Sequence, residues 1–250
     1  MAQSGGSTPT AVVGAVAREE TDGPARLIGV IGLGAIGKAL ARPWVVAGHQ
    51  VLIGSRDPAG RQAETAELGQ ARCVTPAAAV AGSDVVALCV PHTGLDEILR
   101  LDVDWTGKVI IDATNPVALS PEGRLVSGLP VPGTVGEALA RRLPTASVVR
   151  AFTHVMDEVL VSRGIRHPSV WAVAIAGDDE PAKQVVGGLV RDTGFVPVDL
   201  GGLADSAPLD PGGLLFPGAF TAADMRVRLA EYKACRCRPD VSATARGGVS

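Results

Sequence analysis

A glycine-rich turn between an apolar segment and a helical pattern most constrains how this 250-residue chain can fold. Residues 27–32 (LIGVIG) resemble a buried strand, and residues 35–47 carry apolar side chains at helical spacing. The G-x-G-x-x-G pattern that joins them comprises Gly32, Leu33, Gly34, Ala35, Ile36 and Gly37. In this pattern the glycines permit a tight turn, backbone approach to a pyrophosphate, and close packing of helix on strand. The sequence therefore predicts a dinucleotide site at a helix amino terminus. The alternative is a glycine-rich turn that binds nothing.

Alternation of strand and helix patterns continues along most of the chain. The expected strands are 27–32, 50–54, 71–74, 84–90, 108–111, 147–151, 169–176 and 195–199. A strand that is apolar on both faces, such as 84–90, is typical of a parallel sheet covered by helices on both sides. The pattern predicts an α/β fold with a doubly wound, mostly parallel sheet of seven or eight strands. Within the first helix, Pro43 predicts a kink or an early break.

Composition sets the expected boundaries around this domain. Residues 1–26, rich in Gly, Ser, Thr and Ala, predict a disordered extension, and residues 27–200 form the Rossmann domain. Residues 201–234, with a helix at 220–233, form a small C-terminal segment that completes a substrate pocket or dimer contacts. Residues 235–250 predict a disordered tail. Inside the domain, residues 112–132 are rich in Gly, Pro and Ser and predict a long functional or mobile loop.

The end of the second expected strand indicates which dinucleotide is bound. A carboxylate at this point would accept hydrogen bonds from a ribose 2′-hydroxyl and would repel a 2′-phosphate. Here the strand ends in Ser55 and Arg56, and a hydroxyl beside a guanidinium suits a phosphate, with Arg61 as a second contact. The pattern favours NADP(H) over NAD(H). Asp57 lies near the acidic position, and its alternative roles are to cap the next helix or to pair with Arg61.

Three further loops follow strands at the same expected edge of the sheet. Val90, Pro91 and His92 would cover the adenosine-ribose side, and Asn115, followed by Pro116, would bond to the nicotinamide ribose. The alternatives are a solvated histidine and an ordinary Asn-Pro turn. His154, after the sixth strand, is the candidate catalytic proton donor because imidazole titrates near neutral pH. A surface histidine is its alternative, and an acceptor protonated by solvent would need no protein acid.

Composition and cysteine usage narrow the classes of partner and compartment. The net charge of −3 provides no basic face for nucleic acid, and no apolar run is long enough to span a membrane. The spacing of Cys73, Cys89, Cys235 and Cys237 fits neither a disulfide framework nor a zinc site, so no metal is expected. We therefore expect a cytoplasmic protein whose partners are a small-molecule substrate and a second copy of the chain.

Two related reductase mechanisms are excluded by the residues available. Short-chain reductases of the Tyr-x-x-x-Lys type need a lysine one turn after a tyrosine, yet Arg236 follows the sole tyrosine, Tyr232, at that spacing. Reductases of the β-hydroxyacid type need a long helical second domain, which the residues after Gly201 cannot supply within a subunit. A short C-terminal segment is better suited to packing across a two-fold dimer.

From about Leu27 to Leu203 the chain resembles the NADPH-dependent oxidoreductases that act on the deazaflavin coenzyme F420. The resemblance rests on IGLGAIGKAL, IGSRDP, DVVALCVP, KVIIDATNP, VVRAF and AGDDEPAKQVVGGLVRDTGFVPVDLGGL. It implies that Ser55 and Arg56 bind the 2′-phosphate. It also implies direct hydride exchange between NADPH and a deazaflavin, without a metal or a covalent intermediate.

Departures from the family pattern fall on the substrate side. The family commonly has Ala-Phe-Asn-Thr where this chain has Ala151, Phe152, Thr153 and His154, and the segment after Leu203 matches no family segment closely. Three hypotheses therefore remain open: exchange with coenzyme F420, NADPH-dependent reduction of a carbonyl or imine biosynthetic intermediate, and NADP(H) sensing without turnover.

Overall fold

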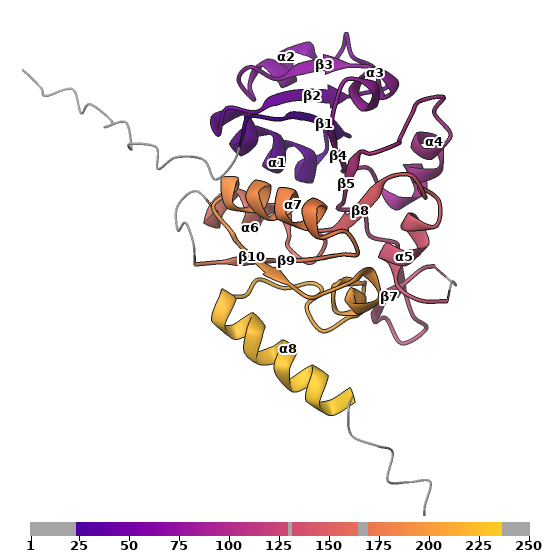
Figure 1. Cartoon of the computed structure of the whole chain (residues 1–250), viewed down its shortest axis with the longest axis vertical. Helices are drawn as coiled ribbons and strands as arrows, with labels where there is room; N and C mark the ends of the chain where they lie inside the picture. The colour runs from indigo at the N-terminus through magenta and orange to yellow at the C-terminus, as the bar shows by residue number, and fades with distance from the viewer. Residues whose placement is uncertain (1–23, 130–131, 165–169, 237–250) are drawn as a thin grey trace, which may run out of the picture.

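The computed structural model describes residues 24–129, 132–164 and 170–236, and within them the chain forms one large sheet (Figure 1). Its eight strands lie in the order β10-β9-β8-β5-β4-β1-β2-β3. The strands are β1 (Leu27–Ile31), β2 (Gln50–Gly54), β3 (Arg72–Val74), β4 (Val85–Leu88), β5 (Val109–Asp112), β8 (Ser147–Arg150), β9 (Ala172–Gly177) and β10 (Val196–Asp199). Each matches an expected strand to within a few residues. The prediction of an α/β, doubly wound sheet is confirmed.

Strand direction places the ends of six strands at one edge. Strands β3, β2, β1, β4, β5 and β8 pair in parallel, whereas β9 runs antiparallel to β8 and β10 runs parallel to β9. The sheet is mostly parallel, as predicted. The loops that leave the carboxyl ends of β1, β2, β4, β5 and β8 therefore share one edge, and the last two residues of β9 pair with the last two of β8.

Helices cover both faces of the sheet, which buries strands such as β4 on both sides. On one face, α1 (Ala35–Val46), α6 (Asp157–Arg163) and α7 (Glu180–Asp192) contribute to one buried apolar cluster, and α2 (Gln62–Ala66) packs beside β3. On the other face lie α3 (Pro76–Ala81), α4 (Leu95–Leu99) and α5 (Val135–Ala140). The C-terminal helix α8 (Ala222–Arg236) packs on β10 through Met225 and Leu229. The predicted helical C-terminal segment is thus present.

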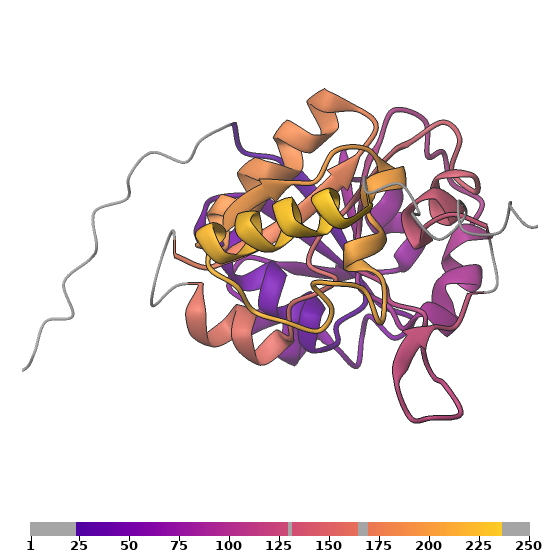
Figure 2. The same cartoon turned by 90° about the horizontal axis from the view of Figure 1, so that it is seen from below.

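Several local predictions differ from the structure. Pro43 does not break α1, which continues to Val46, and the Pro43 carbonyl accepts a hydrogen bond from Ala47 N at 2.8 Å. A proline removes only its own N–H donor, and the turn after Pro43 still closes onto its carbonyl. The predicted loop 112–132 contains an antiparallel hairpin of β6 (Val117–Leu119) and β7 (Leu125–Ser127), which projects from the body in Figure 2.

The predicted ends of the folded region also shift. The Arg26 N–H donates a hydrogen bond to His49 Nδ1, and the Arg26 carbonyl accepts one from the Gln50 N–H, so Arg26 belongs to the folded approach to β1. Cys235 and Arg236 extend α8 rather than beginning a tail. The rest of the predicted extension (1–23) and tail (237–250) lies outside the described residues. None of the described helices combines the length and apolar character needed to cross a bilayer.

Candidate functional site

The three glycines of the 32–37 turn have distinct geometries. Gly32 has a φ of +105°, and a Cβ there would lie 2.7 Å from the Cys89 carbonyl oxygen, so only glycine fits this tight turn. A Cβ on Gly37 would collide with the Gly32 carbonyl oxygen, because α1 packs directly on the end of β1. A Cβ on Gly34 would meet nothing within 4 Å. The open space at Gly34 is what the approach of a pyrophosphate to the backbone requires.

A cleft of about 670 Å³ lies over the carboxyl ends of β1, β2 and β4. The predicted cofactor residues in its wall are Gly32, Leu33, Gly34, Ser55, Arg56, Arg61, Val90 and Pro91. Ala35, Ile36 and Gly37 instead form the first turn of α1 behind it. Residues that the sequence did not single out also line the cleft, namely Pro76, Gly94, Glu97 and Ile98. Most of them precede or belong to α4, whose contribution to the wall depends on packing.

At the end of β2, Arg56 is the side chain most available to an anion. Its side chain is 81% exposed, and its nearest carboxylate is Glu97, at 3.5 Å. Ser55 Oγ accepts a hydrogen bond from the Asp57 N–H at 3.2 Å, and Asp57 Oδ1 accepts one from the Gly60 N–H at 3.0 Å. Asp57 therefore stabilises the turn that leads toward α2. It does not cap α2, whose N-cap residue is Arg61, and the acidic partner of Arg61 is Glu64.

Arg61 lines the same cleft but already has an acidic partner. Its guanidinium pairs with Glu64, which also pairs with Lys38. The hydrogen bond that Arg61 donates to Glu64 raises the pKa of Arg61, and the bonds that Glu64 accepts from Lys38 and Arg61 lower the pKa of Glu64. To bind a phosphate, Arg61 would have to exchange this carboxylate for the ligand.

His92 faces a second cavity, of about 300 Å³, instead of the cleft. We call it the α5 pocket; it is lined by His92, Leu95, Asp112, Thr114, Leu129, Val135, Ala138, Leu139, Arg141 and Arg142. The Nδ1 atom of His92 is buried without a hydrogen-bond partner in the described chain. Burial lowers the pKa of His92, so its ring is neutral at pH 7.

Asn115 joins the loops that follow β5 and β8. Its Nδ2 donates to the Thr153 carbonyl at 2.7 Å, while its Oδ1 is buried and has no partner within the described residues. Neither Asn115 nor Pro116 lines the cleft or the α5 pocket. Asn115 thus lies at the predicted edge, with its side-chain oxygen buried between the two loops.

His154 does not have the geometry expected of a proton donor. Its side chain is buried, Nε2 accepts a hydrogen bond from the Ala174 N–H at 3.1 Å, and Nδ1 lies 3.0 Å from the Gly218 carbonyl. Since Nε2 is an acceptor, Nδ1 carries the hydrogen and donates it to Gly218. Burial lowers the pKa of His154 to about 4. These contacts favour a neutral imidazole that joins the end of β8 to β9 and the C-terminal segment.

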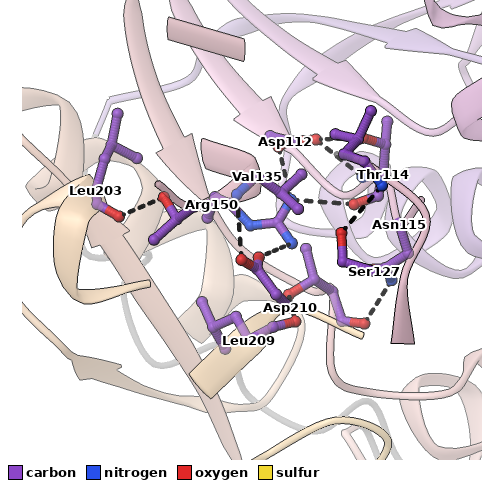
Figure 3. Close-up of polar contacts among 12 residues, drawn as sticks. Asp112, Thr114, Asn115, Ser127, Val135, Arg150, Leu203, Leu209 and Asp210 are labelled. Atoms are coloured by element: carbon purple, nitrogen blue, oxygen red, sulfur yellow. Dashed lines mark hydrogen bonds and ion pairs between the residues drawn. The ribbon is translucent and has the colours of Figure 1, made fainter. Parts of the chain in front are cut away.

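A buried charged cluster around Arg150 lies beneath this edge (Figure 3). Arg150 Nη1 donates to Asp112 Oδ2 at 2.7 Å and to the Thr114 carbonyl at 3.1 Å, and Nη2 donates to Asp210 Oδ1 at 3.0 Å. Asp210 Oδ2 accepts from Val135 N, the first residue of α5, at 3.1 Å. The cluster connects β5, β8, α5 and the C-terminal segment. Sequence reasoning missed it, although an arginine and an aspartate in apolar strands were a usable signal.

The glycine turn, the exposed Arg56 after β2 and the mostly parallel sheet together define a Rossmann-type fold with a cleft suited to a dinucleotide. Residues 27–116 match the family model described as NADP oxidoreductase, coenzyme F420-dependent. A solved structure of a hypothetical protein from Sinorhizobium meliloti is 30% identical and covers 78% of this chain and 95% of its own, with a TM-score of 0.69. The chain belongs to this NADP oxidoreductase family.

Other similar proteins are more distant or much longer. A second solved structure is that of a protein from Arthrobacter sp. FB24 whose proposed activity is F420-dependent NADP reduction. It is 25% identical over 72% of this chain and 86% of its own, with a TM-score of 0.64. The metalloreductase STEAP3 of Rattus norvegicus is 28% identical over 73% of this chain. This chain spans about a third of the length of the curated relatives that it matches. An imine reductase from Aspergillus terreus, solved with NADPH, is 19% identical and shares the fold, with a TM-score of 0.54.

Proposed function

We propose that this protein is an NADPH-dependent oxidoreductase that transfers a hydride to a small organic acceptor. The observation that carries the proposal is that one cleft contains both the open space at Gly34 and the exposed guanidinium of Arg56. A dinucleotide bound over the carboxyl ends of the strands would place its pyrophosphate at Gly34 and its 2′-phosphate at Arg56. Family membership supports the same cofactor.

The residues of the cleft would divide the binding of NADPH among them. The backbone N–H groups at the start of α1 would face the pyrophosphate, where the helix dipole also favours an anion. Arg56 would leave its 3.5 Å contact with Glu97 for the 2′-phosphate, and Ser55 would add a hydroxyl. Asn115 Oδ1, which is buried and lines neither cavity, would have to become exposed to accept a hydrogen bond at the nicotinamide end.

Bound NADPH would supply a hydride from its nicotinamide ring to a carbon atom of the acceptor, leaving NADP⁺, and the reduced acceptor would take a proton from water. The protein would hold the two rings together rather than provide the acid. Both His154 nitrogens are engaged in hydrogen bonds, which favours this division over the proton-donor role.

Coenzyme F420 is the acceptor that the family relationship favours. The altered loop at Thr153 and His154 favours a second candidate, reduction of a carbonyl or imine, because both residues are buried and bonded where family members have a different sequence. We also propose a homodimer, in which the C-terminal segment packs near the two-fold axis.

Absorbance measurements on mixtures of the protein, a nicotinamide nucleotide and each candidate acceptor would test these proposals. Purified protein would be mixed with NADPH or NADH, alone and with coenzyme F420, ethyl levulinate, or ethyl levulinate plus an amine, while the absorbance of each chromophore is followed. Oxidation of NADPH that requires one acceptor supports the proposal and identifies that acceptor. Tight NADPH binding without oxidation by any acceptor would contradict it and favour a sensor.

A further inference from the structure

The α5 pocket and the cleft lie on opposite sides of one short turn. Pro91, Thr93 and Gly94 line the cleft, whereas His92 and Leu95, which alternate with them along the chain, line the α5 pocket. The floor of the α5 pocket includes Thr114, which follows the end of β5 and immediately precedes Asn115. The pocket therefore adjoins the end of the cleft to which the nicotinamide half of a dinucleotide would extend.

Half of the residues that line the pocket are apolar. They come from α4, from the segment before α5, and from α5 itself, and comprise Leu95, Leu129, Val135, Ala138 and Leu139. Asp112 and Thr114 form the polar floor, and the Arg150 cluster fixes both of them (Figure 3). Since Arg150 neutralises Asp112, the floor does not present a free negative charge to a ligand.

Arg141 is the group in the wall that is available to an anion. Its Nη2 donates to the Pro132 carbonyl at 3.3 Å, and within the described part of the chain it has no carboxylate partner. The neighbouring Arg142, in contrast, pairs with Asp96 at 2.7 Å. His92 adds a buried Nδ1 without a partner. An apolar cavity with an uncompensated guanidinium at its wall matches a ligand that has an apolar body and one acidic group.

We propose that the α5 pocket binds the acceptor of the reaction proposed above, and that this acceptor carries a carboxylate that pairs with Arg141. Its body would lie between α4 and α5, with a polar group toward His92 and Thr114. The assignment of this ligand as the hydride acceptor rests on the proposed function. The binding of an apolar organic anion at Arg141 does not depend on that function.

Two fluorescent dyes test the pocket without knowledge of the natural ligand. The dye 8-anilino-1-naphthalenesulfonate has an apolar body and a single anionic group, with the sulfonate in place of a carboxylate. N-phenyl-1-naphthylamine has the same rings without the charge. We expect the native protein to bind both. Arg141→Gln should weaken the anionic dye about tenfold or more, because a charge-assisted contact is lost, and should leave the neutral dye unchanged.

Matched variants locate the dye. Arg141→Lys should retain most of the affinity for the anionic dye, and Arg226→Gln, on an exposed position of α8, should retain all of it. Ala138→Phe should fill the pocket and abolish binding of both dyes. Failure of the native protein to bind the anionic dye, or equal losses in Arg141→Gln and Arg226→Gln, would overturn the proposal. If Ala138→Phe does not fold, the Arg141 comparison decides alone.

The kinetic measurement separates this proposal from the proposed function. With whichever acceptor supports NADPH oxidation, Arg141→Gln should raise KM for the acceptor about tenfold and leave kcat and the affinity for NADPH unchanged. An unchanged KM would overturn the acceptor assignment while hydride transfer stands. Arg141-dependent dye binding without NADPH oxidation by any acceptor would retain the anion site and contradict the reaction.

Discussion

Arg150 Nη1 lies 2.7 Å from Asp112 Oδ2, and both side chains are completely buried. A second carboxylate, Asp210, lies 3.0 Å from Nη2, and burial raises its pKa while the charge of Arg150 opposes that rise. Two carboxylates and one guanidinium are thus packed between the strand ends and the C-terminal segment. The guanidinium of Arg150 lies between the two carboxylates and offsets the cost of burying them.

Replacing Arg150 by methionine should therefore destabilise the protein strongly. The variant would leave Asp112 and Asp210 buried without a cation, and removal of one partner from a buried pair costs about 3 to 5 kcal/mol. Urea unfolding followed by circular dichroism measures this change in free energy.

The double variant Arg150→Met with Asp112→Asn is the control. It should recover part of the loss, because the uncompensated Asp112 charge is gone. A single variant within about 0.5 kcal/mol of the native protein would contradict the account of this cluster.

Gly34 and Gly37 should respond differently to substitution. Gly34→Val should leave the melting temperature close to that of the native protein, because its backbone is extended and its Cβ would point into open space. It should abolish NADPH binding, because the side chain would occupy the space of the pyrophosphate. Gly37→Val should unfold the protein instead. Calorimetric titration and thermal denaturation of both variants separate the two effects, and full NADPH affinity in Gly34→Val would rule out this site.

Arg56→Ala should weaken NADPH binding about 10- to 100-fold and leave NADH binding unchanged, because only NADPH has the 2′-phosphate. Glu97→Gln is the matched control. It removes the carboxylate 3.5 Å from Arg56, so the affinity for NADPH should stay the same or increase. Equal losses for the two nucleotides in Arg56→Ala would contradict the assignment of the 2′-phosphate site.

The buried His154 predicts a loss of stability in mild acid. Its pKa is about 4 in the folded protein and 6.5 as a free side chain, so below pH 6.5 the unfolded chain binds a proton that the folded protein excludes. The contribution is complete above pH 6.5 and is lost as the pH falls toward 4, by about 3 kcal/mol in total.

His154→Gln should remove this pH dependence and lower stability at pH 7. Denaturant titrations across the same pH range provide the comparison. Identical pH slopes in the two proteins would refute the burial argument. A variant with native stability and much reduced kcat would instead restore His154 as the proton donor.

The sequence predicted most of the fold because its signals are local. Apolar runs such as 84–90 and the glycine turn at 32–37 specify strands and a βα junction without long-range contacts. The hairpin of β6 and β7 has short, partly exposed strands, so alternation there is weak. The passage of α1 through Pro43 depends on tertiary packing around a helix end.

The site was predictable where backbone geometry determines it. Gly32, Gly34, Ser55 and Arg56 all line the cleft, as their positions after β1 and β2 required. His92 does not, because the turn before α4 directs it to the opposite side. The surroundings of His154 come from β9 and from Gly218, more than sixty residues later, and no local pattern contains them.

Direct transfer of the nicotinamide hydrogen tests the central claim. NADPH carrying deuterium at the transferable C4 position would be incubated with the protein and coenzyme F420, or with a carbonyl or imine acceptor, and the products analysed by mass spectrometry. We expect one deuterium atom in the reduced acceptor with NADPH, much less with NADH, and none with Gly34→Val. Unlabelled acceptors with every compound, although NADPH is bound, would contradict it.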